Sequence, residues 1–236
     1  MIKAIIFDFD GTLVNTIDGI YNTWVKTFNL LKKKPPTIHM LRSAFGQRRE
    51  ILVKQIMGNE TKETYKKACN IYSDLYDSNA ILASPYNGIK KMLNDLHLLG
   101  LKIAIGTNKP YLHVNNIIMK IFNKEQSVID FIVCPNKYVK GKPSPEIFSK
   151  CAKMWGLSPE EVVVIGDTVF DLIAAKEAGM KSIAVAWGYG NSKILKTYKP
   201  EYFAKRPNHI TLFIQANYLD LKAHKASSID LTCCNH

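Results

Sequence analysis

The chain has 236 residues, of which 47% are apolar and 22% are charged, and this composition excludes collagen-like and disordered proteins. A chain of this length can bury a substantial core without disulfides, and it has room for one large domain or a domain with an insertion. The 32 Lys and Arg residues exceed the 20 Asp and Glu residues by 12, and this surplus favours anionic partners such as phosphorylated metabolites, nucleic acid or acidic lipid headgroups.

Short runs rich in Ile and Val predict five strands, because most of them are apolar at both alternating positions, as in strands covered on both faces. They span residues 2–7, 101–106, 128–134, 162–166 and 182–187. Apolar residues at helical spacing lie between them, and glycines end two of these helices. This alternation predicts an α/β fold with a doubly wound parallel, Rossmann-like sheet. A short edge strand and a last helix are expected after Tyr198.

One connection is longer than a crossover requires. Roughly 90 residues separate the first two predicted strands, whereas a crossover needs about thirty. Asn15 or Thr16 is expected to cap a helix that begins near Asp18, and further amphipathic turns follow. We therefore expect an inserted α-helical cap domain with hinges at both ends. The predicted parts are an α/β core over residues 1–16 and 85–236 and a cap over residues 17–84.

Polar side chains follow four of the predicted strands. In a parallel sheet the carboxyl ends of the strands form one edge, where ligands bind, so these side chains are expected to converge. They are Asp8, Asp10, Thr12, Thr107, Asn108, Lys109, Lys140, Lys142, Asp167 and Asp171, and Gly11 makes the turn after Asp10 together with Thr12. Each residue alone has an ordinary interpretation, such as a turn, a helix cap or a surface charge. Their placement at four successive strand ends favours a shared function.

The residue types in this set suit phosphoryl transfer. Clustered carboxylates are hard ligands of the kind that Mg²⁺ prefers, and the ion keeps waters that a phosphate can replace. A threonine hydroxyl and a lysine ammonium can hold phosphate oxygens. One aspartate can then attack phosphorus to form an aspartyl phosphate. A second aspartate two residues on can protonate the leaving alcohol and later deprotonate the attacking water.

The same residues carry a family resemblance. The chain resembles the haloacid dehalogenase-like hydrolase superfamily over residues 1 to about 215, since F-D-F-D-G-T-L-V, T-N-K-P, the lysine of G-K-P-S-P and G-D-T-V-F-D match its four motifs. The inserted helical segment is similar to the family's type-one cap. The combination of T-N-K-P, K-P-S-P, G-D-T-x-x-D-x-x-A-A-x-x-A-G and W-G-Y-G is most similar to phosphoglycolate phosphatases and their near relatives.

The resemblance implies a role for each matching residue. It makes Asp8 the nucleophile and Asp10 the general acid/base, with Thr107 and Lys142 binding phosphate. The implied Mg²⁺ ligands are the Asp8 carboxylate, the Asp10 backbone carbonyl and Asp167, with Asp171 acting directly or through water. Gly11, Thr12, Asn108 and Lys109 are expected to line the phosphate site. Lys140 is an alternative to Lys142, but Pro143 completes the family's lysine-proline pair and favours Lys142. Asn15 stands where close relatives commonly have Asp, and we interpret it as a helix cap at the hinge.

The predicted cap carries an excess of positive charge. Residues 32–54 contain seven Lys or Arg residues and one acid, Glu50. A turn with the sequence F-G-Q-R-R places Arg48 and Arg49 where relatives put residues that contact the substrate. Because a guanidinium binds carboxylates bidentately, one of these arginines is expected to hold a second anionic group of the substrate. A solvated helix start is the alternative interpretation of this turn.

The leading hypothesis is a Mg²⁺-dependent phosphatase of a small phosphorylated metabolite, with phosphoglycolate as the first candidate. The alternatives are a pyrophosphatase, nucleotidase, sugar phosphatase or phosphosugar mutase on the same scaffold. A more remote alternative is a basic nucleic-acid-binding or regulatory protein with a vestigial site, which intact motifs disfavour. We therefore expect neither a nucleic-acid nor a membrane partner, and oligomeric state stays open. G-Y-G-N-S lacks the third glycine of a dinucleotide loop and is interpreted as a turn.

Cysteine usage and hydropathy point to a cytoplasmic protein. The five cysteines, two of them at 233 and 234 in the tail, include no C-x-x-C pair, which disfavours a disulfide framework and a zinc knuckle and fits a reducing compartment. The apolar N-terminal run contains Asp8 and Asp10, unlike a signal peptide. No run reaches the roughly 18 apolar residues of a membrane span.

Overall fold

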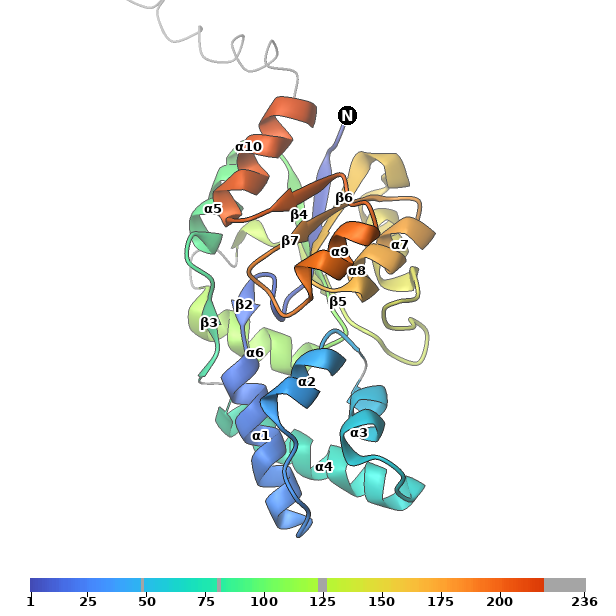
Figure 1. Cartoon of the computed structure of the whole chain (residues 1–236). Coiled ribbons are helices and arrows are strands. Elements are labelled where there is room, and N and C mark those ends of the chain that lie inside the picture. Colours follow the sequence, from blue (N-terminus) through green and yellow to red (C-terminus); the bar gives the residue numbers. More distant parts are fainter. Residues whose placement is uncertain (48, 80–81, 123–126, 219–236) are drawn as a thin grey trace, which may run out of the picture.

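A six-stranded parallel sheet forms the centre of the structure (Figure 1), a computed structural model that describes residues 1–218 except 48, 80–81 and 123–126. In spatial order its strands are β5 (Phe131–Val133), β4 (Lys102–Gly106), β1 (Ala4–Phe7), β6 (Val162–Gly166), β7 (Lys181–Val185) and β8 (Tyr202–Ala204). Every residue of β1 and β6 is buried, as their continuous apolar sequences predict. The predicted doubly wound sheet is confirmed.

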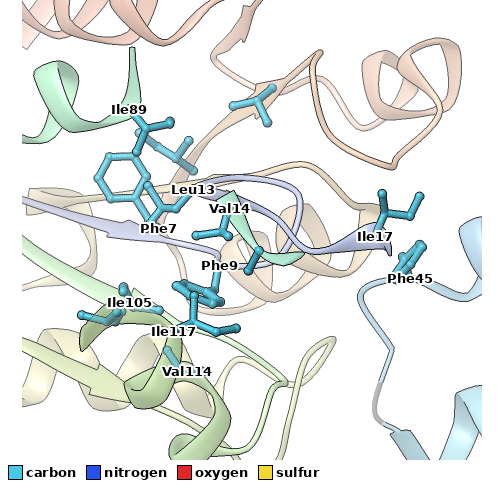
Figure 2. Packing of buried hydrophobic residues seen from close by; sticks show 14 of the residues in the cluster. Phe7, Phe9, Leu13, Val14, Ile17, Phe45, Ile89, Ile105, Val114 and Ile117 are labelled. Carbon is cyan, nitrogen blue, oxygen red and sulfur yellow. The ribbon is translucent and has the colours of Figure 1, made fainter. Parts of the chain in front are cut away.

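Helices cover both faces of the sheet because alternate side chains of each strand point to opposite faces. Ile5 and Phe7 pack in one cluster with α5 (Ile89–Leu98), α6 (Tyr111–Ile121) and α10 (Pro207–Tyr218), whereas Ala4 and Ile6 pack in a second cluster with α7 (Glu146–Trp155) and α8 (Val169–Glu177). Figure 2 shows part of the first cluster, around Phe7. This part of the structure also contains the 3₁₀ helix η3 (Pro159–Glu161) and α9 (Ser192–Thr197).

The third strand, β5, is shorter than the sequence predicts. It begins at Phe131 instead of Val128, because Asp130 has other partners. The Asp130 carboxylate accepts hydrogen bonds from the Ile103 backbone N–H at 3.2 Å and from the Trp155 indole at 2.9 Å. The Asp130 side chain thus satisfies the Ile103 backbone N–H, which would have paired with the backbone of β5 if that strand were longer.

Four further helices lie together beyond the carboxyl ends of the strands, below the sheet in Figure 1. They are α1 (Ile17–Leu30), α2 (Ile38–Ala44), α3 (Arg49–Met57) and α4 (Lys62–Asn79). We call this group the helical cap. Helix α4 packs against α1 and α3, and the rings of Trp24 and Tyr72 meet at 4.3 Å between centroids. In the described part of the chain no helix combines the length and the apolarity needed to cross a membrane.

The two segments that connect the sheet to the helical cap lie side by side. They pair as a short antiparallel ribbon of β2 (Val14–Asn15) and β3 (Ser84–Pro85), at the positions predicted as hinges. Helix α1 starts at Ile17, whose N–H donates to Asn15 Oδ1 at 3.3 Å. The Asn15 side chain therefore caps the start of α1 through this long hydrogen bond. The Thr16 hydroxyl, the other predicted cap, donates to Asp10 instead. The division of the chain into two domains stays a prediction.

Candidate active site

The polar residues at the strand ends converge at one edge of the sheet. Asp8 follows β1, Thr107 follows β4 and Asp167 follows β6, while Lys142 comes from the loop between β5 and α7. All four side chains are buried. Parallel strand topology brings them together, since neighbouring strands of the order β4-β1-β6 end at the same edge.

Lys142 is the central cation of this edge. Its Nζ donates to Asp8 Oδ1 at 2.5 Å, to Asp171 Oδ1 at 2.6 Å and to the Gly106 carbonyl oxygen at 3.1 Å. Burial alone would lower the pKa of Lys142, but the charges of Asp171 and Asp8 raise it above its usual value. Lys140, the alternative, is 79% exposed and pairs with Glu146 on the surface. The structure therefore places Lys142, and not Lys140, among the clustered carboxylates.

Three carboxylates form a group that fits a divalent cation. Asp8, Asp167 and Asp171 each offer an oxygen, and these oxygens lie within 4.8 Å of one another. Burial raises the pKa of Asp8 to about 7 despite the opposing charge of Lys142, and burial with the charges of Asp8 and Asp171 raises the pKa of Asp167. Among the described residues no cation forms an ion pair with Asp167. A bound Mg²⁺ would offset this repulsion with the oxygen ligands that it prefers.

Both oxygens of the Asp171 carboxylate have protein partners. Oδ1 accepts from Lys142, and Oδ2 accepts from the N–H and the hydroxyl of Thr168 at 3.0 and 2.7 Å. These bonds cap the first turn of α8. Asp171 thus holds Lys142 in place, and its expected role toward Mg²⁺, directly or through water, stays a prediction.

Asp10 lines the cavity beside Asp8, is partly exposed and has two hydrogen-bond partners. Its Oδ1 accepts from the Thr16 hydroxyl at 2.6 Å, and Lys109 Nζ contacts both carboxylate oxygens at 2.9 and 3.1 Å. Lys109 is buried, and its ammonium also lies 4.5 Å from the centre of the Tyr76 ring of α4. The predicted phosphate ligand Lys109 therefore orients Asp10 and contacts the helical cap.

Two other predicted phosphate ligands have side chains that bind protein groups. The Thr12 hydroxyl donates to Asp167 Oδ1 at 3.1 Å. The Asn108 amide donates to the carbonyls of Gly46 and Lys142 and accepts from the Lys142 N–H, all within 3.0 Å. These bonds orient Asp167 and the Lys142 loop, and the expectation that Thr12 and Asn108 bind phosphate stays a prediction. Gly11 has φ of 90°, and a Cβ there would overlap the Asp167 carboxylate.

The loop after β7, residues 187–190, also contacts the site, although its sequence is interpreted above as a turn. The Trp187 indole N–H donates to the Thr12 carbonyl oxygen at 3.0 Å, and the Tyr189 backbone N–H donates to Asp167 Oδ2 at 2.7 Å. A Cβ at Gly188 or Gly190 would overlap Asp167. The signal in the sequence is a pair of glycines around a tyrosine directly after a strand, where the backbone must approach a neighbour closely.

A cavity of about 90 Å³ lies between the sheet edge and the helical cap. Asp8, Asp10, Thr107 and Lys142 line its sheet side. Its opposite wall is mainly aromatic and apolar, and its members are Ile20, Trp24, Phe45, Leu52, Tyr72 and Tyr76. Pockets for drug-sized ligands measure about 300 to 1,000 Å³, so this cavity suits a small molecule.

Arg49 is the cationic residue of the helical cap that lines this cavity among the described residues. Its Nη1 donates to the Ser73 hydroxyl and the Cys69 carbonyl oxygen, and the guanidinium carbon lies 5.6 Å from the centre of the Tyr72 ring. Both of these bonds use Nη1, and a guanidinium carries further donors on Nε and Nη2. Arg48, the other arginine predicted for this role, lies outside the described residues.

Comparison with known proteins agrees with this geometry. Pyrophosphatase PpaX of Anoxybacillus flavithermus is 28% identical over 208 residues, which cover 87% of this chain and 93% of that protein. Phosphoglycolate phosphatase of Pseudomonas fluorescens is 26% identical over 206 residues, covering 84% and 74%. A solved haloacid dehalogenase-like hydrolase of Streptococcus pneumoniae has a TM-score of 0.82 at 27% identity, covering 91% and 99%. The family profile described as haloacid dehalogenase-like hydrolase matches residues 5–185, and the chain therefore belongs to that family of hydrolases.

Proposed function

We propose that this protein is a magnesium-dependent phosphatase that hydrolyses a small phosphorylated metabolite through an aspartyl phosphate. The observation that carries the proposal is the buried contact of Asp8 with Lys142, which line a small cavity together with Asp10, and the proximity of Asp167 to Asp8. Names of relatives support the phosphatase class, since two of them are a phosphoglycolate phosphatase and a pyrophosphatase.

In the first step, an Asp8 carboxylate oxygen attacks the phosphorus atom. A bond forms between Asp8 and phosphorus while the bond to the leaving oxygen breaks, and Asp10 donates a proton to that oxygen. Lys142 and the Thr107 hydroxyl bind the phosphate oxygens, where negative charge increases in the transition state. The buried site strengthens these interactions, because few waters compete for the same groups.

In the second step, water hydrolyses the aspartyl phosphate. Asp10, now ionised, accepts a proton from the water as the water oxygen attacks phosphorus, and the Asp8 carboxylate is released with inorganic phosphate. Each turnover therefore returns both carboxylates to their starting states. Thr16 and Lys109 contact the Asp10 carboxylate and keep it oriented in both steps.

The residues that would hold Mg²⁺ are the Asp8 and Asp167 carboxylates and the Asp10 backbone carbonyl. The ion would supply positive charge that allows a dianionic phosphate to approach these carboxylates. Asp167 is held for this role by the Thr12 hydroxyl and the Tyr189 N–H, which fix one oxygen each. Such outer hydrogen bonds orient metal ligands in proteins.

The substrate class follows from the wall opposite the phosphate site. We infer a small phosphate ester or anhydride with a second anionic group, held by Arg49 at the far side of the cavity. Phosphoglycolate fits this description and is the first candidate. Pyrophosphate is the second, because it also carries a second anionic group and because one relative is named for its hydrolysis.

The decisive assay is a panel of phosphate esters and pyrophosphate, each measured with Mg²⁺ and with excess chelator. We expect turnover of small acidic phosphates with Mg²⁺, its loss in chelator and its return when Mg²⁺ is restored. Phosphate release measures turnover, and calorimetric titration of Mg²⁺ measures binding separately. Full activity in excess chelator, or failure of every ester in the panel, would contradict the proposal.

Truncation of Arg49 should change substrate preference. We expect Arg49→Ala to raise KM for phosphoglycolate about 10-fold to 100-fold, because a hydrogen bond to a charged group contributes about 1.5 to 3 kcal/mol. The KM for 4-nitrophenyl phosphate, which lacks a second anion, should stay within about twofold. Lys54→Ala is the matched control, since Lys54 is exposed on the same helix and does not line the cavity. Equal effects on both substrates would show that Arg49 does not contact the second anion.

A further inference from the structure

The loop at residues 187–190 joins three parts of the site that the proposed chemistry treats separately. The Tyr189 backbone N–H binds the Asp167 carboxylate, its hydroxyl reaches the start of α1, and its ring contacts the helical cap. None of the catalytic roles above uses the Tyr189 side chain. The side chain is nevertheless partly buried against residues from all three parts.

The Tyr189 hydroxyl fixes the hinge residue that orients Asp10. It accepts from the Thr16 backbone N–H at 2.7 Å and donates to Asn15 Oδ1 at 3.3 Å. The Thr16 hydroxyl in turn donates to Asp10 Oδ1 at 2.6 Å. Because one residue makes both contacts, displacement of the Thr16 backbone also displaces the hydroxyl that holds Asp10.

The Tyr189 ring connects this arrangement to the turn of the helical cap at residues 45–47. Its centroid lies 4.5 Å from that of Phe45, with 33° between the ring planes. The next residue, Gly46, has φ of 83°, and a Cβ there would overlap the side chain of Thr168, which follows β6. The turn therefore lies closely against the sheet edge, and its position decides whether the Tyr189 ring has a partner.

We propose that Tyr189 is a positioning residue, which holds Asp10 in its proton-donating orientation when the turn at residues 45–47 packs against the sheet edge. The inference rests on the proposed acid/base role of Asp10. The Tyr189 hydroxyl acts on Asp10 by holding Thr16, and the Tyr189 ring packs against Phe45. The backbone N–H bond to Asp167 is independent of the side chain, so substitution of the side chain leaves the candidate metal ligand oriented.

The test compares Tyr189→Phe with the unchanged protein on two phosphate esters of different leaving groups. An alkyl ester such as phosphoglycolate needs a proton on its leaving oxygen, whereas 4-nitrophenolate leaves without one. We expect kcat for the alkyl ester to fall about tenfold, less than the 10² to 10⁴ expected for complete loss of an acid/base group. The kcat for 4-nitrophenyl phosphate should stay within about twofold, and Mg²⁺ affinity measured by calorimetry should not change.

Two variants make the outcomes distinguishable. Tyr218→Phe removes the hydroxyl of a tyrosine at the end of α10, away from the site, which donates to Glu201, and this variant should affect turnover of neither ester. If Asp10 is the acid, Asp10→Asn should lower kcat for the alkyl ester far more than kcat for the aryl ester. Suppose that Asp10→Asn shows this selectivity, whereas Tyr189→Phe lowers kcat for both esters equally or changes neither. The inference on Tyr189 is then wrong, and the proposed function stands. If Asp10→Asn itself treats both esters alike, the acid/base assignment fails, and the inference fails with it.

Discussion

Asp8→Asn is expected to abolish turnover while leaving the fold intact. The amide of asparagine is a poor nucleophile toward phosphorus, so the first bond to the enzyme does not form. Loss of a nucleophile in other enzymes lowers kcat by up to about 10⁶-fold, and we expect a loss of at least about 10⁴-fold here. The measurement is phosphate release at saturating substrate, together with far-ultraviolet circular dichroism to verify the fold.

The matched control for this substitution is Asp18→Asn. Asp18 is an exposed carboxylate in the first turn of α1, so its replacement should leave kcat within about twofold. A second measurement tests the covalent step itself: the unchanged protein, quenched during turnover, should carry phosphate on the peptide that contains Asp8. Appreciable turnover by Asp8→Asn would overturn the mechanism.

Lys142→Met should lower both activity and stability. Lys142 contacts Asp8 and Asp171, and all three side chains are buried. Removal of the ammonium leaves two buried carboxylates without their shared cation, and breaking a buried ion pair from one side costs about 3 to 5 kcal/mol. We expect a free energy of unfolding lower by this amount in urea denaturation of the metal-free protein, and turnover below detection.

Lys140→Met is the control, because it removes a cation two residues away in the same loop. Its ammonium is exposed and pairs with Glu146 at 3.4 Å, and surface substitutions of this kind change stability by about 0.5 kcal/mol or less. Its kcat should also be unchanged. If Lys140→Met lost activity and Lys142→Met kept it, the assignment of the phosphate-binding lysine would be wrong.

Most of the residues proposed for the chemistry could be predicted from the sequence, because each lies within a few positions of a strand end. A buried parallel strand is a continuous apolar run, and its carboxyl end is visible as the point where polar residues begin. Asp8, Asp167 and Thr107 were found in this way, and the structure brings all three to one edge. The prediction needs only local sequence and the rule that parallel strands end on the same side.

The partners of these residues could not be predicted in the same way. Thr12 bonds Asp167, 155 positions further along the chain, and Tyr189 bonds Thr16, 173 positions back. A threonine or tyrosine hydroxyl has the same local sequence signal whether it faces a substrate or a protein group. The roles of Thr12 and Asn108 as supports of Asp167 and the Lys142 loop are therefore visible only in the folded chain.

The amino-acid sequence by itself thus determined the parallel sheet, the helical insertion after its first strand and the carboxylates and lysine at its edge. These features depend on periodicity and on positions relative to strand ends, which are local properties. The tertiary structure alone decided which protein groups orient Asp167, which cation of the helical cap lines the cavity, and how the loop at residues 187–190 contacts Asp167 and Thr16. Those features depend on contacts between distant segments, whose geometry is set by packing of the whole core.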